Sequence, residues 1–429
     1  MEATPPPTPE PAPEHQPEPP SPPTKDPTKE PTPEPAEVAP RRGRRRGALA
    51  ALAAIVVLAA ALVVITRQPA RSAPTPSPSV AAVPTGASPA PTPDATPRET
   101  ASTRPSVEVT PEPSRHPAAL GPIGPDVTGL PTTGRAWRNV VEAADADPGE
   151  PDLTCDQNQR EHPGAALASA LIYARTGDVA YRDRAIDLIE AAYPTARKCE
   201  NSILSLGRQL GAYVMAADYV DYRDPEFVAW LDGIRSQNLG GHARWFTLVG
   251  TAVDTSNNWG IFALASLTAA DAYLEDATAL ERDFRIFHAY GAGGWSFRRT
   301  NDYQKRWACP EGFAINPASC DDPRREGAAV EDASRTRFPR LGQYPAEAAQ
   351  GYVVQAELLD RQGFAAWDVN DRQVCRNALW RERGDNLNFS NADAYVTWMT
   401  NARCGLDQPT DPARMGRVFG FTDWLYGGQ

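Results

Sequence analysis

Proline content divides this chain of 429 residues into a part that cannot form a core and a part that can. Of the 44 prolines, 29 lie before residue 121. Residues 1–40 consist mainly of Pro, Glu and Thr and hold almost no large apolar side chains. Such a segment buries too little surface to offset its loss of chain entropy, so it is predicted to stay disordered. A folded core is therefore expected only after residue 119.

An apolar run follows this N-terminal tail. The tail, residues 1–47, ends in an arginine-rich cluster at 41–46, and the next 18 residues, Ala48 to Ile65, are apolar and uncharged. In a helix they would cover roughly 27 Å, close to the ~30 Å hydrocarbon core of a membrane. We predict a single transmembrane signal anchor over 48–66, with a cytoplasmic N-terminus because the arginines precede it. A cleaved signal peptide is the alternative, although no good small-x-small cleavage site follows.

The segment after the anchor is also poor in core-forming residues. Residues 67–119 are a mixture of Pro, Ser, Thr and Ala. This composition is typical of an extended, disordered stalk. The domain from residue 120 to 429 would then lie outside the cell at the end of that stalk.

Cysteine usage agrees with export. All six cysteines follow the apolar run, and an even number on the exported side indicates disulfides. Fifteen connectivities are possible, but we expect nearest neighbours to pair, most securely in the short Pro- and Gly-containing loop 309–320. No C-x-x-C spacing occurs and His is scarce, so no metal site is expected. The expected pairs are Cys155 with Cys199, Cys309 with Cys320, and Cys375 with Cys404.

Helical periodicity dominates residues 120–429. Apolar residues recur at steps of three and four, and short turns with capping residues separate the periodic segments. Only the aromatic stretch 295–299 suggests a strand. Because helices joined by short loops pack antiparallel, we predict an all-α domain: an incomplete α/α toroid of helix pairs, or alternatively an irregular bundle. The expected helices are 165–176, 179–192, 203–220, 226–236, 261–274, 279–290, 346–361 and 372–380.

The net charge of the domain limits the classes of molecule that it can bind. The formal net charge is −11, and residues from 120 onward carry all of it, which argues against a nucleic-acid partner. Residues 298–340 are locally basic within this acidic domain. Arginines can bind the carboxylates of a sugar acid, and aromatic rings can stack on sugar rings, so this stretch predicts a cleft for an acidic polysaccharide. An equal alternative is a long loop that its aromatic side chains hold on the helical bundle. A monomer is expected. The aromatics in or beside this stretch are Trp295, Phe297, Tyr303, Trp307 and Phe313.

Two helix starts carry the side chains that β-elimination on a sugar acid needs. Residues 256–260 read Ser-Asn-Asn-Trp-Gly, and residues 337–344 read Arg-Phe-Pro-Arg-Leu-Gly-Gln-Tyr. Elimination removes the weakly acidic proton beside the carboxylate, so the site must neutralise that charge and supply a base. We therefore take Tyr344, Arg337 and Asn258 as the candidate catalytic residues. The alternative for Tyr344 is a buried aromatic ring whose hydroxyl bonds a carbonyl.

Further candidates would bind the substrate, and each has a structural alternative. Arg208 lies in an apolar helix, so it must reach a carboxylate, either in a cleft or in a structural salt bridge. His242, in a glycine-rich loop, is a possible general base or an ordinary surface residue. The other candidates are Asn257 (otherwise a helix cap), Trp259 (otherwise core) and Arg340 (otherwise a solvated basic face).

The chain from Gly129 to Trp424 resembles the alginate lyase superfamily of α/α-toroid polysaccharide lyases. The resemblance is carried by Asn-Asn-Trp-Gly at 257–260 with its Ala-rich helix, and by Arg337 seven residues before Tyr344. Secondary landmarks, similar to those of the secreted actinobacterial branch, are Leu206-Gly207-Arg208-Gln209-Leu210 and Ile315-Asn316-Pro317.

The resemblance implies a function for the helical domain 120–429. It implies that a uronate polymer is cleaved by β-elimination without a cofactor. In that reaction Asn258 would help to neutralise the substrate carboxylate, Arg337 would lie near the reacting sugar, and Tyr344 would be the acid/base. The chain departs from the pattern at Trp259, where characterised members have a histidine. The chain departs again at Gly-Gln 342–343, where characterised members often have a histidine just before the tyrosine.

Two other functions remain open. A non-catalytic carbohydrate-binding domain would keep the cleft without the base, which Trp259 in place of histidine favours. A glycoside hydrolase would use paired carboxylates, such as Glu311 with Glu331 or Asp332. Products separate the three: a lyase forms an unsaturated sugar, a hydrolase forms reducing ends alone, and a binding domain forms neither.

Overall fold

The described part of the chain is helical. Every described residue lies within the unit Ser106–Gln429. The predicted tail, anchor and stalk therefore lie outside the described residues. The all-α prediction is confirmed, since the described residues contain no strand. In this computed structural model these residues are 122–240, 246–295, 297, 307–309, 312–334, 343–383, 394–413 and 415–428.

All eight predicted helices are present. The described residues also contain short or overlooked helices that the periodicity did not predict: α2, α7, α10, α13, α14 and the 3-10 helix η1 (Tyr193–Thr195). The predicted strand at 295–299 is absent at Trp295 and Phe297, its two described residues. The helices are α2 Gly134–Asp145, α3 Glu161–Thr176, α4 Val179–Ala192, α5 Ser202–Tyr219, α6 Pro225–Ile234, α7 Leu248–Asp254, α8 Asn258–Tyr273, α9 Ala277–Ala292, α10 Val330–Ser334, α11 Gln343–Arg361, α12 Val369–Arg383, α13 Ala394–Cys404 and α14 Thr422–Tyr426.

None of the helices in the described ranges is both long and apolar enough to cross a membrane. The anchor predicted at 48–66 is outside those ranges.

Helices α5 and α8 lie at the centre of the domain, and nearly every residue of both is buried. Most of these residues are apolar, as is typical of a helix with no solvent-exposed face. Gly207 lets them approach closely: a Cβ there would lie 2.9 Å from the Ala263 nitrogen. The Ser266 hydroxyl donates to the Gly207 carbonyl at 2.8 Å and accepts from the Gly211 N–H at 3.0 Å. Residues of α5 that face α8 are therefore held in a fixed register.

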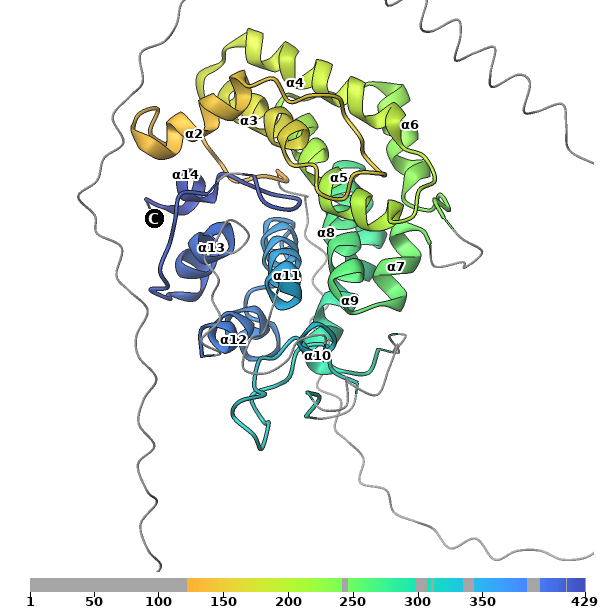
Figure 1. Ribbon diagram of the computed structural model, residues 1–429, viewed down its shortest axis with the longest axis vertical. Helices are drawn as coiled ribbons and strands as arrows, with labels where there is room; N and C mark the ends of the chain where they lie inside the picture. The colour runs from red at the N-terminus through yellow and green to blue at the C-terminus, as the bar shows by residue number, and fades with distance from the viewer. Residues whose placement is uncertain are drawn as a thin grey trace, which may run out of the picture. The chain divides into compact units, whose positions relative to one another are not determined.

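The helices follow one another around the domain in chain order (Figure 1). Helix α3 packs on α5, α5 on α8, α8 on α11 and α11 on α13, while α4, α7, α9 and α12 pack against members of this series. The last helix, α14, contacts α2. The Trp137 and Trp424 rings lie 5.1 Å apart, and the Trp424 indole donates to the Pro131 carbonyl at 2.8 Å. The beginning and the end of the described domain are thus in contact.

Three disulfides join neighbouring segments, and the nearest-neighbour prediction is confirmed for all of them. Their Cα–Cα distances are 5.4, 5.5 and 5.6 Å, in the usual range for a disulfide. One fixes the loop before α3 to the segment before α5, and another joins α12 to the end of α13. The pairs are Cys155–Cys199, Cys309–Cys320 and Cys375–Cys404, which leaves no free cysteine.

Candidate functional site

Asn257 begins α8 as its N-cap. Its side-chain oxygen accepts from the N–H groups of Trp259 at 3.0 Å and Gly260 at 3.4 Å. Its amide nitrogen donates to Glu331 Oε1 at 2.8 Å, and the Ser256 hydroxyl donates to Glu331 Oε2 at 3.3 Å. The capping interpretation of Asn257 is confirmed. Both polar atoms of its side chain have partners within the protein.

Asn258 differs from its neighbour because its side chain is not fully satisfied. It is the first residue of α8 and only 2% exposed. Its backbone N–H donates to Asp332 Oδ1 at 3.3 Å, while its side-chain oxygen has no hydrogen-bond partner among the described residues. A buried polar atom left unsatisfied costs about 1–3 kcal/mol. The unsatisfied atom is an acceptor, so Asn258 can still accept a hydrogen bond at the start of α8.

Glu331 and Asp332, in the first turn of α10, bring two carboxylates to the start of α8. Both are buried, at 4% and 0% exposure. The donors of Ser256 and Asn257 hold one carboxylate, and the Asn258 N–H holds the other. Both acids were candidates from the sequence, but their contact with the Asn pair was not predicted.

Trp259 faces the core. It is half-buried and packs against the main hydrophobic cluster, with its ring edge-on to Phe246 at 6.4 Å between centroids. The core interpretation of Trp259 fits this placement better than a sugar-stacking surface does.

Arg208 is buried in the middle of α5, where it joins three segments. Its Nη2 lies 2.7 Å from Glu347 Oε2 on α11, and its Nη1 donates to the Gln157 carbonyl at 3.2 Å. Its guanidinium carbon lies 5.4 Å from the centroid of the Phe262 ring on α8. Its Nε has no partner within the described chain. The structural salt bridge predicted as an alternative for Arg208 is therefore present.

Charges around Arg208 are mostly positive. Burial lowers the pKa of Arg208, Glu347 opposes this, and the positive charge of Arg160 lowers the pKa further. An arginine nevertheless stays charged in proteins. The buried Arg417 adds another guanidinium, with its Nε 3.9 Å from Glu347 Oε2 and its Nη2 donating to Asn158 Oδ1 at 3.2 Å. Two arginines, Arg208 and Arg417, thus share Glu347, and Arg160 lies near Arg208.

Tyr344 lies at the start of α11, beside this arginine cluster (Arg160, Arg208 and Arg417). Its side chain is 44% exposed, so the alternative interpretation of Tyr344 as a buried aromatic ring is wrong. The phenol is near enough to Arg208 to raise the pKa of that guanidinium. Tyr344 and Glu347 are three residues apart on α11, a spacing that puts both on one helix face. An accessible phenol and a buried cation therefore share one region.

The start of α8 approaches the same region. Asn258 and Phe262 are four residues apart and share one face of α8, and Arg208 lies over the Phe262 ring. Helices α8 and α11 also pack directly on each other, where the Gln355 amide donates to the Ile261 carbonyl. Arg208 thus lies between the face of α8 that carries Asn258 and the face of α11 that carries Tyr344.

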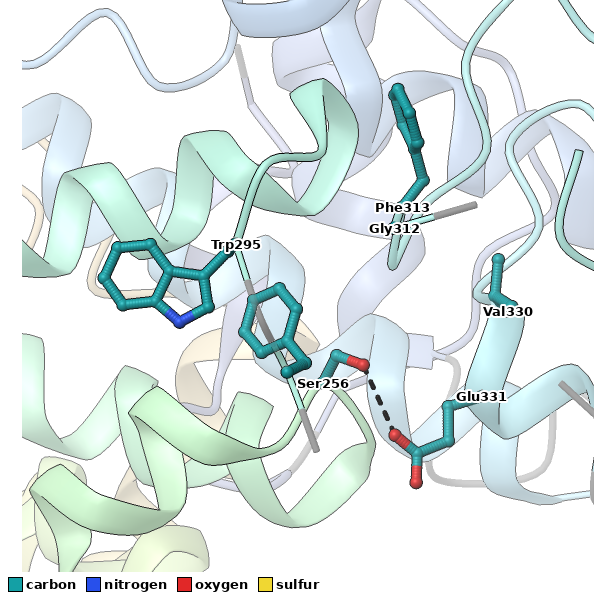
Figure 2. Close-up of a pocket in the computed structure, with 7 residues that line it drawn as sticks. Ser256, Trp295, Gly312, Phe313, Val330 and Glu331 are labelled. Atoms are coloured by element: carbon teal, nitrogen blue, oxygen red, sulfur yellow. Dashed lines mark hydrogen bonds between the residues drawn. The ribbon is translucent and has the colours of Figure 1, made fainter. Parts of the chain in front are cut away.

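A pocket opens next to the acid pair, formed by aromatic rings and one carboxylate (Figure 2). The Trp295 indole is fixed by donating to the Val253 carbonyl at 2.9 Å. Figure 2 shows the Ser256 hydroxyl bonded to Glu331 at one side of the pocket. Trp307, which was predicted to belong to the aromatic cleft, packs on Trp380 instead. The lining residues are Ser256, Trp295, Phe297, Gly312, Phe313, Val330 and Glu331.

Some predicted residues lie outside the described parts of the chain: Arg337, Arg340, His242, Glu311 and Tyr303. In the described parts, no group of three or more His, Cys, Asp or Glu side chains is arranged to hold a metal ion.

Glu347 and Arg417 were not among the site residues predicted from the sequence. Glu347 could have been found from the sequence, because its spacing from Tyr344 puts both side chains on one face of α11. Arg417 had none, because 70 residues separate it from the carboxylate that it approaches.

Comparison of the chain with protein-family models, with curated proteins and with solved structures finds no match.

Proposed function

We propose that this protein is a polysaccharide lyase that cleaves a uronic-acid-containing, alginate-like polymer by β-elimination. One observation carries the proposal: a buried cation, Arg208, lies between the helix face of Asn258 and the helix face of the accessible Tyr344. These are the three kinds of group that the elimination needs, namely a cation for the carboxylate, an amide donor and an ionisable hydroxyl.

An incomplete α/α toroid is the architecture that we propose for the domain. It is supported by the order in which α3, α5, α8, α11 and α13 pack on one another, and by the contact between α14 and α2. In such an arrangement the starts of α8 and α11 face one end of the domain. We further propose that the domain is extracellular, held by the anchor at 48–66 through the stalk at 67–119.

Arginine charge and the Asn258 amide would make the reaction possible by stabilising the uronate carboxylate. Charge neutralisation acidifies the proton on C5, the carbon beside that carboxylate. Tyr344, as phenolate, takes this proton. The electron pair forms the C4–C5 double bond while the bond from C4 to the glycosidic oxygen breaks. Tyr344 then returns the proton to the departing oxygen, so the protein ends as it began and no cofactor is consumed.

Product analysis tests the proposal. The full-length protein is incubated with alginate, glucuronan, hyaluronan and pectate, and both far-ultraviolet absorbance and reducing ends are followed. A lyase produces the two signals in equal amounts. Absence of the absorbance signal on every polymer would refute the proposal.

A glycoside hydrolase is the second candidate, favoured by the pocket in which Glu331 lies among aromatic rings beside Asp332. A hydrolase needs two carboxyl groups, one as acid and one as base or nucleophile. It would release reducing ends without an unsaturated product, so the same assay separates the two. A binding domain without activity would give neither signal.

A further inference from the structure

The loop between α2 and α3 supplies two acceptors that hold the arginine cluster. The Gln157 carbonyl accepts from Arg208 Nη1 at 3.2 Å. The side-chain oxygen of Asn158, the next residue, accepts from Arg417 Nη2 at 3.2 Å. Each guanidinium approaches Glu347 with another of its nitrogens. Because a guanidinium is planar and its N–H donors form a fixed fork, partners on two different nitrogens fix its orientation. The loop and Glu347 together therefore decide where these two cations point.

Residues 152–158 of this loop, the acceptor loop, contain no helix and are held on α5 by a buried amide. The Gln209 side chain is 0% exposed and directly follows Arg208 in α5. Its amide nitrogen donates to the Asp152 carbonyl at 3.1 Å and to the Asp156 carbonyl at 2.8 Å. The helix that carries Arg208 thus also sets the position of the loop that orients it.

The Cys155–Cys199 disulfide adds a covalent link at the centre of the acceptor loop. Cys199 lies three residues before α5 begins at Ser202. Beside the disulfide, the hydroxyl of the buried Thr154 accepts from the Arg197 N–H at 2.9 Å. Both cysteines are half-buried, so water can compete with hydrogen bonds in this region but not with the disulfide. The disulfide therefore limits how far the acceptor loop can move from α5.

We propose that the acceptor loop is a positioning element for the uronate site and that the Cys155–Cys199 disulfide keeps it in place. The inference rests on the proposed lyase function and adds residues that act through Arg208 and Arg417 rather than on the sugar. With the loop in place, both guanidinium groups hold one orientation toward the uronate carboxylate. With the loop released, the same charges remain but must be ordered when the substrate binds, so the affinity for the uronate falls.

Asn158→Ala tests the acceptor loop without changing the disulfide. Asn158 is exposed, so the stability of the full-length protein should change little. The variant removes an acceptor of Arg417, and the uronate carries its charge both before and during elimination. KM on the best polymer should therefore rise about three- to tenfold, with kcat changed less than about twofold. Asn158→Asp keeps an oxygen at this position and should restore KM. Asp147→Ala is the matched control, since Asp147 is an exposed residue of the same α2–α3 loop that accepts from the Gly149 N–H.

Replacing Cys155 and Cys199 together with serine tests the covalent link. Loss of stability alone lowers the amount of folded protein, which reduces the apparent kcat and leaves KM unchanged. Release of the acceptor loop raises KM instead, and we expect a rise of about tenfold. Serine at Cys375 and Cys404 is the matched control, because that disulfide joins α12 to the end of α13 and has no part in holding the loop. An unchanged KM in both the Asn158→Ala and the Cys155/Cys199 variants overturns the proposal while the lyase function stands.

Chemical modification of arginine decides the question even if no polymer is cleaved. Arg208 and Arg417 are 7% and 3% exposed, so phenylglyoxal should modify both guanidinium groups slowly in the parent protein. Peptide mapping should find both modified at least about tenfold faster in the Cys155/Cys199 variant, and at the parent rate in the Cys375/Cys404 variant. Arg324, whose side chain is 75% exposed, serves as the internal reference. If no polymer yields unsaturated product, the lyase proposal fails, and these rates still report on the acceptor loop. Equal rates in the parent and the Cys155/Cys199 variant overturn its positioning role.

Discussion

Replacing Tyr344 with phenylalanine separates catalysis from stability. The change removes one hydroxyl and keeps the ring. Because the side chain is 44% exposed, no fully buried polar group is lost. We expect the free energy of unfolding to change by less than ~0.5 kcal/mol, as for other surface substitutions.

The expected loss of activity is much larger. A positioned acid/base contributes at least ~10²-fold to the rate, equivalent to about 2.7 kcal/mol of transition-state stabilisation. Formation of unsaturated product on the best polymer should therefore fall below about one hundredth, while the denaturant midpoint stays the same.

Tyr193→Phe is the matched control, since Tyr193 is a half-buried tyrosine on η1 that packs on Phe227 and Trp230. It should leave the elimination rate unchanged. The reasoning is refuted if Tyr344→Phe keeps more than about a tenth of the activity. It is equally refuted if the variant loses several kcal/mol of stability, because Tyr344 would then be a packing residue.

Further predictions concern stability and are measured by denaturant unfolding. Arg208→Leu should cost about 3–5 kcal/mol because it leaves Glu347 short of a buried partner, and adding Glu347→Leu should recover much of that loss. His162 has a pKa lowered by burial to about 4 from 6.5, so the unfolded chain binds its proton more readily. Stability should therefore fall by up to about 3 kcal/mol between pH 6.5 and 4, and His162→Gln should remove this part of the pH dependence. Replacing Cys375 and Cys404 together with serine should cost about 3–4 kcal/mol, because their disulfide closes a sequence separation of 29 residues. A double variant as stable as the parent would contradict this.

Local sequence signals account for most of the helices. Apolar periodicity located α8 from Ile261, but the helix begins at Asn258 because the Asn257 cap precedes the first apolar residue. Helices α10 and α14 have five residues each, too few to show a period. Helix α2 does carry apolar residues at Trp137, Val140 and Ala144, and sequence analysis overlooked this pattern.

Disulfide pairing was predictable for a related reason. The sequence separations of the three pairs are 44, 11 and 29 residues, and no other cysteine lies between the two members of any pair. Loop closure costs less entropy for short loops, so nearest neighbours are favoured when helices pack in chain order.

Long-range contacts at the site could not be predicted in this way. The Arg208–Glu347 ion pair spans 139 residues, and the Asn257–Glu331 hydrogen bond spans 74. Each depends on which helices become neighbours and in what register, which is decided by close approaches such as that of Gly207 to α8. The sequence indicated that a buried Arg208 needs a carboxylate, but many acids in this chain met that condition.

Acidic and basic side chains approach the start of α8 from different elements. The backbone N–H of Asn258 donates to Asp332 of α10, the neighbour of Glu331. One turn further along α8, Phe262 lies under the guanidinium of Arg208. In the lyase that we propose, the uronate carboxylate would bind on the Arg208 side of Asn258, because opposite charges attract and like charges repel. That placement would bring the proton to be removed toward Tyr344, which also lies near Arg208.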